Sequence, residues 1–265
     1  LGVVGWQAQR ALREAARAQA MQRFVTELFQ DAGSSSNTPI DLRSLLDMGI
    51  LRGERSLARQ PEARAELYGA VAQLRLGLGD YREARDLLAR QSRLLRLLPD
   101  APASLRLEAA TLNGNVFQQL GEPRTCTVRM QPLEAKAQQE EPRLPLQAAA
   151  FYAQLGRCRR ELGDFDAARR LHARALELRR REKDEAGMAE TRLDMANLES
   201  AMGQPAAAIR TLVDGLAQLR RTLGGHHPQA INMLRALCSL ERATDAREAA
   251  TRDCHAPLRL ARELL

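Results

Sequence analysis

A glycine-centred turn recurs along this sequence at a nearly constant interval. It reads Leu-Gly-Asp-Tyr at 78–81, Leu-Gly-Glu-Pro at 120–123, Leu-Gly-Asp-Phe at 162–165 and Met-Gly-Gln-Pro at 202–205, with a weaker version at 244–246. The intervals are 42, 42, 40 and 42 residues. A small residue follows each turn in step, at Ala84, Cys126, Ala168, Ala208 and Ala250. Ordinary helical bundles have no reason to keep one interval, so the pattern predicts an array of similar units.

Residues 149–182 are the best-preserved unit. Two stretches with helical spacing flank the turn at Gly163, and small residues, Gly156 and Ala168, allow the two helices to approach closely. Tyr152 and His172 are expected to fill the wedge between the helices. This spacing of large, small and turn residues resembles the tetratricopeptide repeat. The resemblance implies an all-α fold, a right-handed superhelical solenoid of helix-turn-helix repeats. The 3% aromatic content agrees with helices rather than sheets.

The register divides residues 35–265 into a degenerate repeat at 35–60 and repeats at about 65–98, 107–140, 149–182, 189–222 and 231–264. Pro132 falls inside the second helix of the 107–140 repeat, so we predict a kink there. The segment Leu-Gly-x-x-His-Pro at 223–228 resembles the link in repeats of the kinesin light chain type, which the 42-residue interval also matches. Pro228 suits a first helical turn, and we interpret His226 and His227 as linker or cap residues rather than metal ligands.

Residues 1–34 are interpreted as a membrane-proximal helix. Residues 1–6 form an apolar run that ends at Trp6 and passes directly into a basic helical stretch, as at the end of a membrane-spanning helix. About 20 residues are needed to span a bilayer, so the run would be the trimmed end of a transmembrane segment. The alternative is an apolar helix start that packs on the protein itself.

A second resemblance involves the segment at 20–32, the Leu-Leu-Asp-x-Gly motif at 45–49 and the Gln-Pro-Glu turn at 60–62. These residues resemble the region that follows the transmembrane helix in bacterial membrane-bound serine/threonine protein kinases, although the Pro expected soon after Ala32 is missing. The resemblance implies a sensor region on the periplasmic side of the inner membrane. The alternative is the interaction module of a membrane-bound or soluble transcription regulator, in which the excess arginine could contact nucleic acid; a soluble regulator would be cytoplasmic. The sequence holds no kinase motif, so a kinase domain would lie upstream.

Stacked helix pairs present their first helices on a concave surface. Amides such as Asn115 and Asn197 dominate one register position there, and an amide can donate and accept hydrogen bonds at once. The resemblance to tetratricopeptide repeats implies that asparagine at this position bonds the backbone of an extended peptide. The predicted partner-binding groove comprises Gln73, Thr111, Asn115, Gln118, Arg157, Arg160, Asn197, Arg235, Ser239 and Arg242. The alternative is an inner face that is only solvated.

The chain is basic, with a formal net charge of +7, and arginine supplies almost all of its cations because lysine occurs only at Lys136 and Lys183. Arginine could form a groove for a protein or peptide that is acidic or has a free C-terminal carboxylate, or it could merely cover solvated helix faces. The low aromatic content argues against nucleic-acid binding by base stacking. We find no nucleophile–base pair, phosphate loop or metal motif, and we therefore predict no catalytic residues, no cofactor and no metal.

Two further expectations concern single side chains. The cysteines form no Cys-x-x-Cys pair, and Cys126 and Cys238 fall at small positions, so we expect free, buried thiols. The register places Cys254 one helical turn from the residue opposite Cys238, beyond the roughly 7 Å that a disulfide can bridge. Arg75 and Arg159 stand where the repeat family usually has an aromatic residue. Their stems can pack while the guanidinium groups reach solvent or an acidic neighbour.

Overall fold

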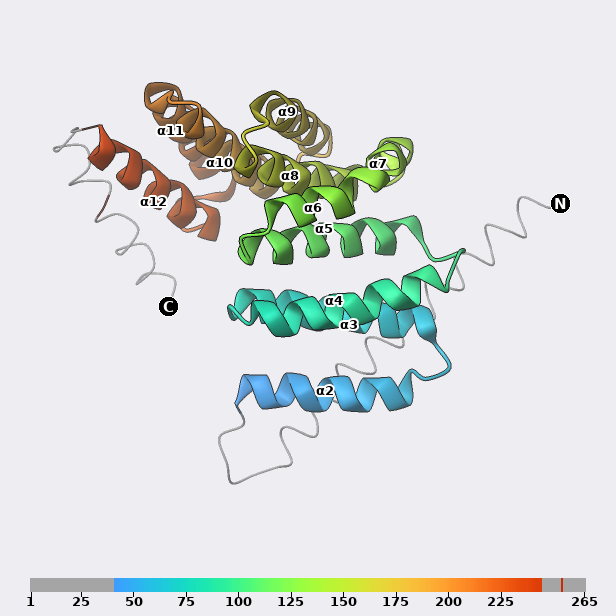
Figure 1. The fold of residues 1–265 in the computed structure, drawn as a ribbon. Coiled ribbons are helices and arrows are strands. Elements are labelled where there is room, and N and C mark those ends of the chain that lie inside the picture. The colour runs from blue at the N-terminus through green and yellow to red at the C-terminus, as the bar shows by residue number, and fades with distance from the viewer. Residues whose placement is uncertain (1–40, 245–253, 255–265) are drawn as a thin grey trace. The chain divides into compact units, whose positions relative to one another are not determined.

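The computed structural model describes residues 41–244 and Cys254, and the described chain is helical, with short connections (Figure 1). The interpretations of residues 1–34, including the apolar run at 1–6, and of most of the second helix of the last repeat lie outside these residues. Among the described helices, none combines the length and apolar character needed to cross a membrane. The elements are α2 (Leu42–Ser56), α3 (Pro61–Gly77), α4 (Tyr81–Arg96), α5 (Ala103–Gln119), α6 (Pro123–Met130), η1 (Gln131–Leu133), α7 (Glu134–Glu140), α8 (Pro145–Glu161), α9 (Phe165–Arg181), α10 (Glu185–Ala201), α11 (Pro205–Leu223) and α12 (Pro228–Ala243).

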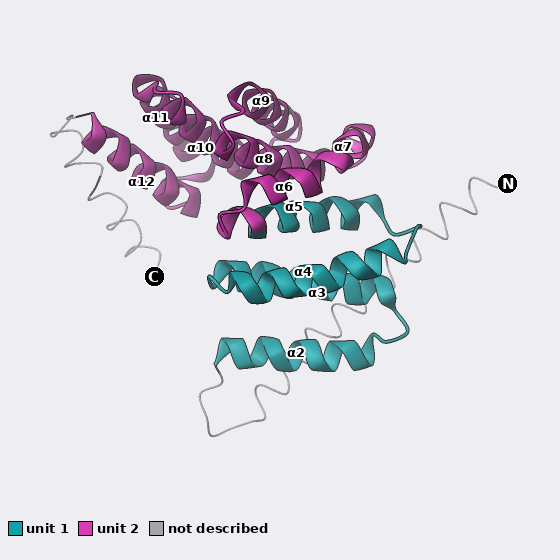
Figure 2. Cartoon of the chain, viewed as in Figure 1, with its two compact units in different colours: residues 1–116 teal, residues 117–265 magenta. Residues whose placement is uncertain are grey.

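The chain divides into two compact units, residues 1–116 and residues 117–265 (Figure 2). In the first unit, buried residues of α3, α4 and α5 form a core that includes Ala65, Leu95 and Leu105. In the second unit, α8 packs on α9 and α10 packs on α11, and a core that includes Leu212 and Met233 joins α10, α11 and α12. The predicted all-α fold of successive helix pairs is therefore confirmed.

The turns fall at the predicted glycines. Gly79, Gly121, Gly163 and Gly203 have φ between +73° and +80°, a conformation that L side chains rarely adopt. At Gly163 the N–H of the next residue, Asp164, donates to the Arg159 carbonyl at 3.0 Å, the six-to-one bond that ends a helix in a Schellman motif. The small residues that follow the described turns are fully buried, at Ala84, Cys126, Ala168 and Ala208.

Arginine replaces the usual aromatic residue without leaving its charge unpaired. The Arg75 guanidinium, on a residue only 4% exposed, donates to Asp80 at 3.0 Å, and Arg159 donates to Asp164 at 3.1 Å. In each case the aspartate directly follows the turn glycine and precedes the next helix. The expectation of an acidic neighbour is confirmed, and the arginine ties the end of one helix to the start of its partner.

The second helix of the 107–140 repeat is broken where Pro132 predicts a kink. The α-helix ends at Met130, a 3-10 turn follows at Gln131–Leu133, and α7 begins at Glu134. Proline lacks the N–H that would continue the α-helical bonding and its ring crowds the preceding turn. The prediction of an irregular second helix is confirmed.

The expectation of free cysteines is wrong. Cys126 of α6 is bonded to Cys158 of α8, with their Cα atoms 6.2 Å apart, and Cys238 of α12 is bonded to Cys254, with a Cα separation of 4.9 Å. The first pair joins the second helix of one repeat to the first helix of the next. The expectation of free thiols considered only pairs of cysteines within one repeat. The Cα separation of the second pair is below the upper limit of roughly 7 Å for a disulfide, whereas the repeat register predicts a larger separation.

Helix α9 of the second unit carries a fully buried histidine, His172. His172 occupies the position that holds Leu88, Met130 and Leu212 in other repeats, and neither ring nitrogen has a hydrogen-bond partner. A Cβ added to Gly156 would lie 2.7 Å from the His172 Cε1 atom, so the glycine makes room for the ring. Burial, with the positive charges of Arg157, Arg160 and Arg179, lowers the pKa of His172 to about 3.

We expect His172→Leu to reduce the acid sensitivity of the protein. Unfolding restores an ordinary pKa near 6.5, so the unfolded state binds the extra proton and native stability falls as the pH drops from about 6.5 towards 3. At pH 5 the histidine should account for about 2 kcal/mol of this loss. The measurement is urea unfolding of both proteins at pH 7 and pH 5. An identical pH dependence in the two proteins would contradict this account of His172.

Candidate functional site on the first helices of the second unit

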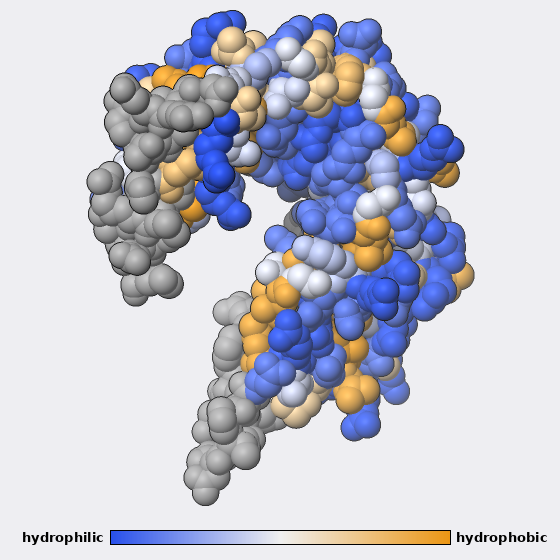
Figure 3. All heavy atoms as spheres, turned by 60° about the vertical axis from the view of Figure 1, so that its left-hand side comes forward, coloured by the Kyte–Doolittle hydropathy of each residue, from blue (hydrophilic) through white to orange (hydrophobic). Residues whose placement is uncertain are grey.

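The first helices of successive repeats lie side by side in the second unit. Helix α10 contacts both α8 and α12, so residues at equivalent register positions on these three helices share one surface. In the view of Figure 3, hydrophilic residues cover much of the surface and hydrophobic ones form small patches. The predicted groove residues on these helices are themselves polar or charged.

The predicted groove residues divide between the two units. Gln73, Thr111 and Asn115 belong to the first unit, where Gln73 is exposed and the Thr111 hydroxyl donates to the Leu107 carbonyl at 2.9 Å. The remaining predicted residues belong to the second unit, and only these are considered as one surface: Gln118, Arg157, Arg160, Asn197, Arg235, Ser239 and Arg242.

Arg157 is committed to pairs within the protein. Its Nε donates to Asp194 at 2.9 Å and its Nη2 donates to Glu190 at 2.7 Å, so α8 is fastened to α10. Glu190 also accepts from Arg179 of α9 at 2.9 Å. Burial alone would raise the pKa of Glu190, but the charges of Arg157 and Arg179 outweigh it and lower that pKa. Burial raises the pKa of Asp194 despite the opposing charge of Arg157.

The predicted groove residues Gln118 and Arg160, near α8, also bind other side chains of the protein. The Gln118 amide donates to Glu161 at 2.7 Å, and its oxygen accepts from Gln154 at 2.8 Å. Arg160 lies 3.5 Å from the same Glu161 carboxylate. These groups satisfy one another, so the surface near α8 has little free hydrogen-bonding capacity to offer a partner.

Helix α12 differs from α8 because its three predicted groove residues are exposed. Arg235, Ser239 and Arg242 follow one another at i, i+4 and i+7, a spacing that places them on one side of the helix. Asn197 of α10 is exposed at the register position equivalent to Ser239. Within the part of the chain that the structure describes, none of these four side chains has a hydrogen-bond or ion-pair partner. We call this set the α12 face.

The sequence reasoning missed the acids that neutralise Arg157. Glu190 and Asp194 stand at i and i+4 on α10, a spacing that places both on one side of that helix. That spacing was a signal, although only the packing of α8 on α10 shows which arginine they face.

His227 caps α12 by accepting from the Gln229 N–H at 3.2 Å, which confirms the cap interpretation. In the described residues no group of three or more His, Cys, Asp or Glu side chains could hold a metal ion.

A comparison with known protein families supports the prediction of repeats in the second unit. Residues 146–220 match the tetratricopeptide repeat family. The matched segment runs from α8 into α11 and so includes the Arg157 pairs and Asn197. No curated protein sequence gives a significant match to the chain.

Solved structures show the same fold at low sequence identity. BtubC (BKLC) from P. vanneervenii is 17% identical, with a TM-score of 0.64 over 83% of this chain and 89% of that protein. A putative kinesin light chain with nearly identical TPR-like repeats, from Podosopora anserina, is 17% identical, with a TM-score of 0.57 over 77% of this chain and 97% of that one. A Rap protein complexed with competence and sporulation factor is 10% identical, with a TM-score of 0.67 over 97% and 77% of the two chains.

Proposed function

We propose that the second unit is a protein-interaction module that binds an acidic peptide segment along its first helices, with the α12 face as the main contact. The observation that carries the proposal is the contrast between the two ends of the surface. The cation of Arg157 on α8 is neutralised within the protein, whereas Arg235 and Arg242 on α12 are exposed without an acidic partner in the described chain.

The chemistry of the α12 face suits an extended acidic peptide. Guanidinium groups bind side-chain or C-terminal carboxylates through paired, charge-assisted hydrogen bonds. The amide of Asn197 and the hydroxyl of Ser239 can both donate and accept, which fits a peptide backbone. The fold is compatible with such a role, since a Rap regulator of the plasmid pLS20, which matches this chain with a TM-score of 0.65, was solved in complex with the Phr* peptide.

The proposal is tested by selecting binders from a random library of ten-residue peptides with free C-terminal carboxylates. We expect the selected sequences to be rich in Asp and Glu. In the variant Arg235→Gln/Arg242→Gln, their dissociation constants, measured by fluorescence anisotropy, should rise about tenfold or more, since a hydrogen bond to a charged group contributes about 1.5–3 kcal/mol.

The matched control is Arg220→Gln/Arg221→Gln, which removes the same charge from exposed positions on α11, a second helix. This variant should bind the selected peptides as the parent protein does. Equal losses in both variants would show that only net charge matters, and unchanged affinity in the α12 variant would contradict the proposal. Binding of random DNA in place of peptides, with a steep salt dependence, would favour the transcription-regulator alternative.

We further infer that the chain is the periplasmic sensor region of a transmembrane serine/threonine kinase. The paired cysteines support an oxidising compartment, since all four cysteines of the sequence form disulfides and such bonds are rare in reducing cytosol. Alkylation of the protein isolated from its own cells should detect no free thiol; reduced cysteines would favour the cytoplasmic alternative.

The reading frame upstream of Leu1 should encode a membrane span and a kinase domain, and a different effector domain there would refute the kinase assignment.

A further inference from the structure

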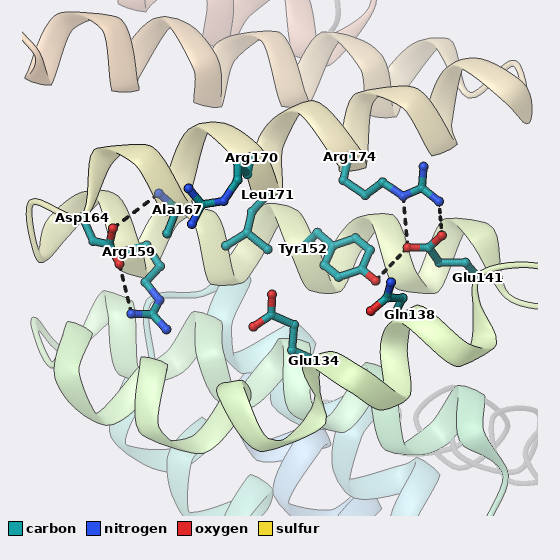
Figure 4. Close-up of a pocket in the computed structure, with 10 residues that line it drawn as sticks. All are labelled: Glu134, Gln138, Glu141, Tyr152, Arg159, Asp164, Ala167, Arg170, Leu171 and Arg174. Carbon is teal, nitrogen blue, oxygen red and sulfur yellow. Dashed lines mark hydrogen bonds and ion pairs between the residues drawn. The ribbon is translucent and has the colours of Figure 1, made fainter.

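The broken second helix of the 107–140 repeat opens a pocket beside α9. The pocket has a volume of about 370 Å³ and lies between α7, α8 and α9, all in the second unit (Figure 4). It is lined by Tyr152 and Arg159 of α8, whereas Arg157, two positions from Arg159, is turned towards α10. The pocket is therefore separate from the surface to which the proposed peptide would bind. Its volume falls in the range of small-molecule sites.

Two internal ion pairs form a fixed frame around the pocket. At one end Arg174 of α9 is bonded to Glu141, which also accepts from the Tyr152 hydroxyl at 2.8 Å. At the other end Arg159 donates to Asp164 at 3.1 Å. The Arg174 guanidinium lowers the pKa of Glu141 against the effect of burial. Burial and the neighbouring Glu141 carboxylate raise the pKa of Tyr152, which therefore stays a neutral hydrogen-bond donor.

Two charged side chains that line the pocket are left over from these pairs. Glu134, at the start of α7, is half-buried, and Arg170 comes from α9 on the other wall. Neither has a hydrogen-bond or ion-pair partner in the described chain. Figure 4 shows the Glu134 carboxylate directed into the space between the helices, with Leu171 between it and the Arg170 side chain. The pocket thus offers a free anion and a free cation on opposite walls, with an apolar contact between them.

We propose that this pocket binds a small zwitterion that carries an ammonium group and a carboxylate, namely a free amino acid or a dipeptide. The ammonium group would donate to Glu134, and the carboxylate would accept from Arg170, both through charge-assisted bonds. A simple anion would meet the repulsion of Glu134, and a simple cation would meet that of Arg170. A zwitterion satisfies both groups, and an apolar side chain would contact Leu171.

The test uses titration calorimetry of the full chain with L-leucine and with the dipeptide Leu-Gly. We expect at least one of these zwitterions to bind at millimolar concentration or below. Each charge is then removed from the ligand in turn: N-acetyl-L-leucine lacks the ammonium group and L-leucinamide lacks the carboxylate. Both should bind about tenfold or more weakly than L-leucine, because each loses one charge-assisted contact.

Variants of the protein identify which wall holds which charge. In Glu134→Gln the preference for L-leucine over N-acetyl-L-leucine should disappear, and in Arg170→Gln the preference over L-leucinamide should disappear. The matched controls are Glu182→Gln and Arg180→Gln, exposed residues of the α9 region that do not line the pocket, and both should keep the parent preferences. Absence of binding by both zwitterions, or preferences that survive in the pocket variants, would overturn the proposal. Neither result depends on whether a peptide binds the α12 face.

Discussion

Replacing Arg157 with leucine is expected to lower the free energy of unfolding by about 3–5 kcal/mol, since the change leaves a buried ionic group without its partner. Arg157 bonds to Asp194 and Glu190 across the contact between α8 and α10, and Asp194 is only 6% exposed. Leucine restores apolar volume but supplies no donor for the Asp194 carboxylate. The measurement is equilibrium urea unfolding at pH 7, compared with the parent protein.

The loss should also depend on pH. Burial already raises the pKa of Asp194, and without Arg157 it should rise further, so the folded variant binds a proton that the unfolded chain releases at ordinary acid pH. The stability deficit should therefore be larger at pH 8 than at pH 5.

Two variants separate this explanation from a simple loss of charge. Adding Asp194→Asn to the leucine variant removes the unpaired carboxylate and should recover part of the stability. The control Arg235→Leu removes an exposed arginine of the α12 face, where surface substitutions usually change stability by about 0.5 kcal/mol or less. If Arg157→Leu were as stable as this control and lost only peptide affinity, Arg157 would belong to the binding surface, as the sequence predicts, and the structural assignment would be wrong.

Loss of the Cys126–Cys158 disulfide is expected to cost about 3–4 kcal/mol of stability on a chain-entropy estimate. The bond joins two residues that are 32 positions apart in the sequence. It links α6 to α8 shortly before the second helix of the repeat is broken at Pro132. Both sulfur-bearing residues are fully buried at tightly packed positions, so alanine in their place keeps the small size that helix packing needs. Urea unfolding of Cys126→Ala/Cys158→Ala measures the effect.

A background without the second disulfide gives the cleanest comparison. In Cys238→Ala/Cys254→Ala the Cys126–Cys158 pair is the only disulfide left, and a reducing agent should destabilise this protein by the same amount. The protein with all four cysteines changed to alanine should not respond to the reducing agent. A reductant-insensitive background protein would show that the bond does not stabilise the fold.

The sequence predicts the backbone of the repeats well because each turn depends on local chemistry. A positive φ such as that of Gly163 favours glycine in any fold, Pro132 breaks an α-helix wherever it lies in the interior, and Pro228 begins one. Small residues such as Ala168 mark close helix contacts because a larger side chain would not fit. These features could therefore be read from spacing alone.

The side-chain partners could not be predicted in the same way. The register position of Arg157 predicts a groove residue. Its pairing with Asp194, 37 positions away in the sequence, depends on the distance between α8 and α10 in the fold. The disulfide between Cys126 and Cys158 likewise crosses from one repeat to the next. The pocket near Glu134 lies beside the broken helix, and although Pro132 predicts the break, the sequence does not show which side chains line the space.

Recognition of the partner by the first helices of the second unit, and above all by α12, can be measured by hydrogen–deuterium exchange of the full chain with and without a selected acidic peptide. We expect the peptide to slow amide exchange in α10 and α12 and to leave exchange in α9 and α11 unchanged. Protection confined to α9 and α11, with α12 exchanging as in the free protein, would show that the second helices bind the partner instead.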